Sequence, residues 1–174
     1  MNDAIRIFSP LSDLMGMCLV ALLTCGVVSA SALEPTVESQ LVANRVVTLA
    51  GAEVFKPADK ANPGDVIEYR ARYVNKGAIG VAALAATIPV PPGTEYWTGT
   101  ARPNGALASA DGINFSAMPL RRAVRTDDGK TRDELVPTME YRALRWELGA
   151  LPAGADAVVS LRVRVTPTTP PAKK

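Results

Sequence analysis

The stretch that decides the fold is residues 62–75, which read NPGDVIEYRARYVN. From residue 66 onward, apolar and charged side chains alternate; the apolar set is Ile67, Tyr69, Ala71 and Tyr73, and the charged set is Glu68, Arg70 and Arg72. A period of two is typical of a β-strand with one buried and one solvated face. Pro63 and Gly64 favour a turn immediately before it. The segment therefore predicts a strand over 66–75.

The same alternation recurs toward the C-terminus, around Trp146 and again over 156–166. Leu144, Trp146 and Leu148 should face a core, as should Tyr69 and Tyr73. Shorter Val-, Thr- or aromatic-rich runs bounded by Gly and Pro predict further strands at 41–49, 53–57, 81–90, 94–100, 113–118 and 121–126. Residues 126–138 are polar and predict a long exposed loop. Seven to nine short strands separated by such turns predict an all-β fold, an antiparallel immunoglobulin-like β-sandwich.

The N-terminal segment predicts export. Residues 14–28 are uncharged and mostly apolar, and small residues follow at Ala30 and Ala32, as in a helical signal peptide cleaved after residue 32. Two alternatives stay open, an uncleaved membrane anchor and a lipoprotein attached through Cys25. The predicted domains are a signal peptide over 1–32, one sandwich domain over 33–166 and a disordered Pro/Thr/Lys tail over 167–174.

Composition excludes most catalytic chemistry from the mature chain. The chain has no histidine, and both cysteines, Cys18 and Cys25, lie inside the predicted signal. Imidazole acid/base catalysis, thiolate nucleophiles, zinc-thiolate sites and disulfides are thereby excluded. The acidic cluster over 127–134 lacks calcium-loop spacing and contains Lys130 and Arg132, so a solvated loop is expected. We expect no enzyme activity, no metal and no cofactor.

Charge gives little information about partners. The formal net charge is +2, and the longest basic runs are the pairs Arg121-Arg122 and Lys173-Lys174. A nucleic-acid partner is not expected from such scattered charge. Contact with a membrane is expected only through the N-terminal segment, if that segment is not removed.

Three blocks of sequence resemble the bacterial DUF11 family, the conserved repeat domain. The first is the PGD turn, the strand and the N-x-G end over 62–77; the second is VPPGTEY over 90–96; the third is WELGALPAG over 146–154 with VVSLRVRV after it. The resemblance covers residues 41–166 in a single copy, and it implies an immunoglobulin-like sandwich of exported envelope or surface proteins, without catalytic residues. The family's tandem stalk role is in doubt for a single copy, and Ile88 stands where the family often has an acidic residue.

Four arginines and one tryptophan are the candidate interaction residues. Arg70 and Arg72 occupy polar positions of one predicted strand, and Arg162 and Arg164 occupy those of another. If both strands belong to one sheet, the four guanidinium groups form a patch that can bind anionic groups of an envelope polymer or acidic partner. The competing interpretation is that they are ordinary cover of a polar sheet face. Trp97 must point away from its neighbour Tyr96, so one of the two is expected at the surface.

Together these observations predict a non-catalytic structural or protein-interaction module of the bacterial cell envelope, periplasmic or at the cell surface. The alternative is a periplasmic ligand-binding or surface-assembly accessory protein that acts through an open sheet edge, as in β-augmentation. An uncharged edge would favour the alternative. An enzyme would instead need a deep pocket that holds two close carboxylates.

We expect the mature protein to begin at Leu33, because small residues at 30 and 32 follow an apolar core of signal length. The intact mass of the exported form measures this directly. A species that retains Met1, or one with a lipid on Cys25, would contradict cleavage after Ala32.

Overall fold

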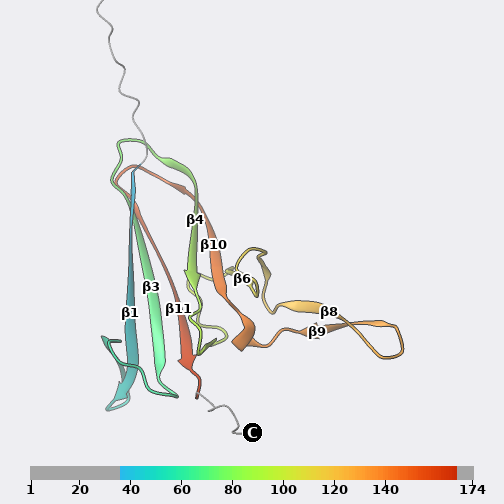
Figure 1. Cartoon of the computed structure of the whole chain (residues 1–174). Helices are drawn as coiled ribbons and strands as arrows, with labels where there is room; N and C mark the ends of the chain where they lie inside the picture. The colour runs from blue at the N-terminus through green and yellow to red at the C-terminus, as the bar shows by residue number, and fades with distance from the viewer. Residues whose placement is uncertain (1–35, 168–174) are drawn as a thin grey trace, which may run out of the picture. The chain divides into compact units, whose positions relative to one another are not determined.

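The computed structural model describes residues 36–167, and they form an all-β structure (Figure 1). Eleven strands and one 3-10 turn follow in chain order: β1 (Val37–Leu49), β2 (Ala52–Pro57), β3 (Val66–Asn75), β4 (Val81–Pro89), β5 (Thr94–Tyr96), β6 (Leu107–Ser109), β7 (Ser116–Ala117), β8 (Arg121–Arg125), β9 (Thr131–Leu135), η1 (Thr138–Glu140), β10 (Ala143–Leu151) and β11 (Asp156–Val165). The predicted signal peptide over 1–32 and all of the predicted tail except Pro167 lie outside the described residues. Within 36–167, no helix is long and apolar enough to span a bilayer.

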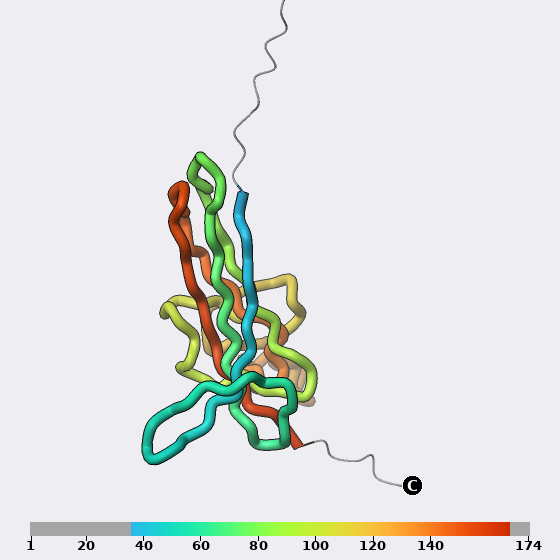
Figure 2. The backbone as a smooth tube through the Cα atoms, turned by 90° about the vertical axis from the view of Figure 1, so that its left-hand side faces the viewer, coloured from blue at the N-terminus to red at the C-terminus, as the bar shows by residue number. Residues whose placement is uncertain are grey.

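Two antiparallel sheets pack face to face. Sheet A has the order β2-β1-β3-β11-β5, sheet B has the order β4-β10-β6-β7, and β8 and β9 form a separate hairpin. The chain crosses between the two sheets after β3, β4, β5 and β10, and β4 packs against β3 and β11. Figure 1 shows the two layers, and Figure 2 shows β1, β3 and β11 side by side in sheet A. The predicted antiparallel sandwich is confirmed.

The strand predicted over 66–75 is β3, and it lies in the middle of sheet A between β1 and β11. Ile67 and Ala71 face sheet B and are buried, whereas Arg70 and Arg72 face outward and are exposed. On β11, every second residue from Val159 to Val163 has no exposed surface. Each strand therefore contributes one apolar face to the core, as its period of two predicts.

Trp146 lies in the centre of the core, as predicted. It pairs with Ala86 of β4, is 2% exposed, and its indole Nε1 donates a 2.8 Å hydrogen bond to the carbonyl of Pro103. This bond satisfies the only polar atom of the ring in an apolar environment. Tyr69 and Tyr73 also face inward as expected, but they are only half-buried.

Asn75, the last residue of β3, connects two of these crossings, the one after β3 and the one after β10. Its side chain is completely buried, and Nδ2 lies within hydrogen-bond distance of three carbonyl oxygens: Ile79 at 2.8 Å, Leu151 at 3.1 Å and Pro152 at 3.2 Å. Its Oδ1 accepts a 3.0 Å bond from the N–H of Gly77. Buried polar groups need hydrogen-bond partners, and this amide finds them in both turns. The side chain of Asn75 therefore holds the β3–β4 turn against the β10–β11 turn.

Three predictions of local structure were wrong. The expected loop over 126–138 contains β9, which pairs with β8 over Arg121–Arg125; its residues are polar, so no apolar period marked it. The strand expected over 94–100 ends at Tyr96, because a turn with Gly99 at φ +75° follows. The strand expected over 113–118 is reduced to Ser116–Ala117, and β6 over 107–109 was not predicted.

We expect Asn75→Ala to lower the free energy of unfolding by about 3 kcal/mol or more, since the substitution leaves several buried backbone groups without partners, each costing roughly 1–3 kcal/mol. Asn104→Ala is the control, because Asn104 is exposed and should change stability by about 0.5 kcal/mol or less. Denaturant midpoints of both variants measure this. Similar midpoints would show that the two crossings do not depend on the amide of Asn75.

Candidate functional site

The four candidate arginines lie on one face of one sheet. β3 and β11 are neighbours in sheet A, with Arg70 opposite Ser160 and Glu68 opposite Arg162. Residues directly opposite each other in an antiparallel pair share a face. Arg70, Arg72, Arg162 and Arg164 therefore all project from the outer face of sheet A, and the condition for a common patch is met.

Glu68 is at the centre of this face. Its Oε1 accepts a 2.8 Å bond from Arg70 Nη2, and its Oε2 accepts a 3.2 Å bond from Arg162 Nε. Arg162 also makes a two-pronged contact with Glu53 of β2, with distances of 2.8 and 2.7 Å. The hydrogen bonds from Arg162 hold the pKa of Glu53 below its ordinary value. The same contact with Glu53 raises the pKa of Arg162, because its effect outweighs the opposing effect of burial.

Glu68 was expected to be an exposed outer residue, and this expectation was wrong. It does face outward, but only 5% of its surface is exposed. The β1–β2 hairpin explains the burial, since Figure 2 shows this hairpin bending across the lower ends of β3 and β11, where Glu53 meets Arg162. The partner Glu53 was not identified from the sequence because it lies 109 residues from Arg162.

Each of the four arginines has a carboxylate partner in the folded chain. Besides the Glu68 cluster, Arg72 Nε lies 3.0 Å from Asp156 Oδ2, and Arg164 Nη1 lies 4.0 Å from Glu95 Oε1. Four positive groups thus face four negative groups. An anionic polymer would have to displace these carboxylates from the arginines. Binding of such a polymer stays a prediction, and the ion pairs make it less favourable.

Trp97 is the exposed member of its pair. It is 39% exposed, whereas Tyr96 is 3% exposed and faces the core. The guanidinium carbon of Arg164 lies 5.0 Å from the centre of the Trp97 ring, within the range of a cation–π contact. One face of this ring is therefore already covered by the chain itself.

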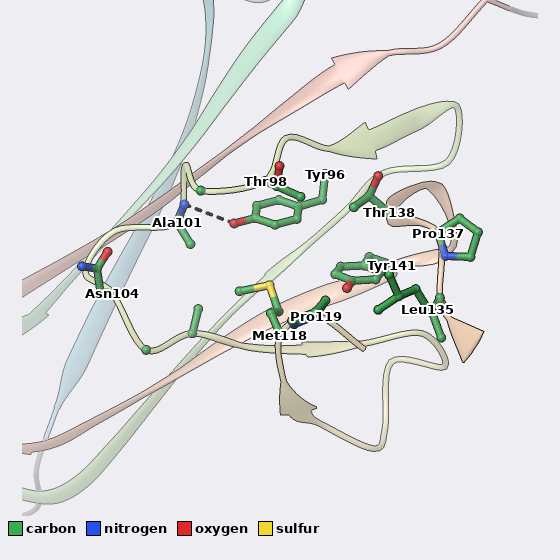
Figure 3. A pocket seen from close by; sticks show the side chains of 14 residues that line it. Tyr96, Thr98, Ala101, Asn104, Met118, Pro119, Leu135, Pro137, Thr138 and Tyr141 are labelled. Atoms are coloured by element: carbon green, nitrogen blue, oxygen red, sulfur yellow. Dashed lines mark hydrogen bonds between the residues drawn. The ribbon is translucent and has the colours of Figure 1, made fainter. Parts of the chain in front are cut away.

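A pocket of about 660 Å³ opens between the β5–β6 segment and the base of the β8–β9 hairpin (Figure 3). Its floor includes the stacked rings of Tyr96 and Tyr141, whose centres are 6.0 Å apart. Both hydroxyl groups accept backbone N–H bonds, from Ala101 at 3.3 Å and from Leu120 at 2.9 Å, so the rings are fixed in place. The lining contains no charged side chain. Such a pocket admits an uncharged, largely apolar molecule.

The acidic cluster over 127–134 is divided between a turn and a strand. Asp128 lies in the β8–β9 turn and pairs with Lys130 at 3.2 Å, and Glu134 of β9 pairs with Arg132. Across residues 36–167, no group of three or more His, Cys, Asp or Glu side chains is arranged to hold a metal ion.

The free edge of β4 is the second candidate site. β4 is the outermost strand of sheet B and its sequence, VAALAATIP, contains no charge. The N–H of Val90 bonds to Arg142 on the β10 side, so alternate residues Ile88 and Ala86 also direct their backbone groups toward β10. Ala85 and Thr87 then direct theirs away from β10, to a side where sheet B has no further strand within residues 36–167.

Among residues 36–167, the N-terminal half of β1 has a free edge in sheet A. β2 pairs only with residues from Asn44 onward, and Ala43 accepts a bond from Ala58, so Ser39 and Leu41 direct their backbone groups to an unpaired side. The side chain of Leu41 faces sheet B, yet Leu41 is 51% exposed, because β4 packs over β3 and β11 rather than over β1. We call the space between the free edge of β4 and residues 37–43 of β1 the edge notch.

The chain matches no protein-family model, no curated protein and no solved structure. The resemblance to the DUF11 family stays a prediction. In this chain the N-x-G block over 75–77 forms a turn in which Asn75 Oδ1 accepts a hydrogen bond from the N–H of Gly77.

We expect Glu68→Gln to lower the free energy of unfolding by about 1–3 kcal/mol, because the buried amide cannot accept charge-assisted bonds from both Arg70 and Arg162. Glu95→Gln removes a longer and more exposed contact, and its effect should stay below about 1 kcal/mol. Chemical denaturation of both variants compares the two. A larger loss for Glu95→Gln would show that Glu68 does not organise this face.

Proposed function

We propose that the chain is a non-catalytic, exported protein-interaction module of the bacterial cell envelope that binds its partner at the free edge of β4. The observation that carries this proposal is the uncharged, unpaired edge of a nine-residue strand. Folded proteins usually protect such edges with charges, bulges or covering segments, because unpaired backbone groups are a template for another strand. An edge without charge is therefore suited to strand addition.

The composition of the chain supports a binding role over a chemical one. With neither histidine nor a cysteine beyond residue 25, the chain has few groups that act as bases or nucleophiles near neutral pH. The buried carboxylate of Glu68 is held by two arginines rather than directed into a cleft. The apolar signal-like segment and the resemblance to exported envelope proteins support the location.

The edge is favoured over the other two candidate surfaces. The arginine face is balanced by its own carboxylates, and the apolar pocket offers few polar groups to select a ligand. The edge offers both unpaired backbone donors and acceptors, which supply affinity, and adjacent apolar side chains, which supply specificity.

A photoreactive amino acid at Ala83 tests the proposed function in the native host. Ala83 is exposed on β4, so irradiation should give an adduct of discrete mass in the envelope fraction. The same amino acid at Glu147 is the control, since this residue is exposed on β10, the neighbouring strand of the same sheet.

An adduct from Ala83 alone would support binding at the edge of β4. Adducts of equal yield from both positions would indicate collision rather than binding. The absence of any adduct at Ala83 would overturn the proposed function.

A further inference from the structure

We infer that the edge notch accepts a single extended segment of another protein, uncharged and apolar at alternate residues, which completes sheet B by lying between β4 and β1. This inference rests on the proposed function and specifies its partner. A strand bonded to Ala85 and Thr87 would occupy the empty position of sheet B opposite β1. Its inward side chains would then cover Leu41 and Val37, which are 51% and 36% exposed.

The offset between the two sheets creates this position. Stacked sheets lie about 10 Å apart, which is the space that side chains from both layers fill. Sheet A continues past β3 with β1, while sheet B stops at β4, which packs over β3 and β11. In the described part of the chain, no strand therefore lies opposite the inner face of β1 along 37–43.

A second copy of this chain does not fit the edge notch through its own β4. Pairing two copies of β4 around a two-fold axis would extend sheet B, but it would also bring the partner copy's sheet A alongside. Because sheet A projects one strand beyond β4, the second copy's β3 would fall where β1 already lies. A single added strand avoids this overlap, whereas a second sandwich paired through β4 does not.

The segment directly after β11 is a poor occupant of the edge notch. Residues 167–174 include three prolines, which lack the N–H that a ladder needs.

The lining defines the chemistry of that segment. β4 contributes no charge, and Glu38 is the only charged residue in 37–43. A charged side chain buried here would lack a partner, which is costly. Apolar residues at alternate positions would face β1, while the residues between them would face solvent beside Ala83 and Ala85.

The test uses the exported chain and a capped, fluorescein-labelled peptide of alternating Thr and Val, nine residues long, in fluorescence anisotropy. A peptide with its central Val replaced by Pro is the control ligand. Two variants separate the contacts. Ala85→Pro removes a backbone N–H that faces away from β10, and Leu41→Lys places a charge on the floor of the edge notch. Val158→Lys is the matched control, since Val158 is 41% exposed on the outer face of sheet A.

We expect the Val peptide to bind the wild-type chain as a one-to-one complex. Ala85→Pro and Leu41→Lys should each weaken binding at least roughly tenfold, and Val158→Lys should change it less than about twofold. Thermal melts confirm that each variant is folded. Ala85→Pro and Leu41→Lys should leave the melting temperature within a few degrees of wild type, and Ala86→Lys serves as the unfolding reference because Ala86 is buried.

The outcomes separate this inference from the proposed function. If Ala85→Pro weakens binding and Leu41→Lys does not, a strand pairs with β4 without covering β1, and only the inference fails. If the chain binds as a dimer, the single-segment inference is also overturned. If neither folded variant changes binding, or the Val peptide does not bind, both the edge and the notch are wrong.

Discussion

The buried amide of Asn75 is the interaction on which the arrangement of the two sheets depends. Nδ2 contacts carbonyl oxygens of the turn after β3 and of the end of β10 and the turn after it, where two of the four crossings between the sheets lie. Because an unpaired buried amide is costly, the contacts allow little sliding of one crossing against the other. Asn75 thus fixes the turn before β4 against the turn before β11 at one end of the sandwich.

The offset between the two sheets has an energetic consequence at the edge of the sandwich. Covering Leu41 and Val37 would gain hydrophobic free energy of roughly 25 cal/mol per Å² of apolar surface buried, yet the folded chain leaves both side chains partly in water. On the outer face of sheet A, the positive charge of Arg162 is neutralised by ion pairs with Glu68 and Glu53. Among residues 36–167, sheet A therefore has a neutralised outer face and an incompletely covered inner face, and we propose that the partner binds at the incompletely covered face.

The sequence predicts the strands whose two faces differ most in polarity. β3 and β11 alternate apolar and charged residues, and Trp146 is flanked by Leu144 and Leu148, so their orientation could be deduced residue by residue. β9 could not be deduced, because TRDEL has no apolar period and its pairing with β8 depends on the turn closed by Thr126 and Lys130. The edge of β4 was predicted as a strand, but not as an edge.

The candidate site was partly predictable for the same physical reason. Periodicity placed Arg70 and Arg162 on polar faces, and their common sheet follows from the register of β3 with β11. Their carboxylate partners depend on the bent β1–β2 hairpin, a long-range feature that no local pattern encodes. The edge notch depends on the stacking offset of the two sheets: among residues 36–167, β1 continues sheet A past β3 while sheet B ends at β4, and no local pattern encodes this pairing of distant segments.

Amide hydrogen exchange of the free chain, followed by NMR, tests most directly whether the edge of β4 is open. We expect rapid exchange for Ala85 and Thr87, whose N–H groups face away from β10, and slow exchange for Ala86 and Ile88, whose N–H groups face β10. The alternation should persist at all protein concentrations. Slow exchange at all four residues would contradict the account, because it would show that the free chain already covers this edge.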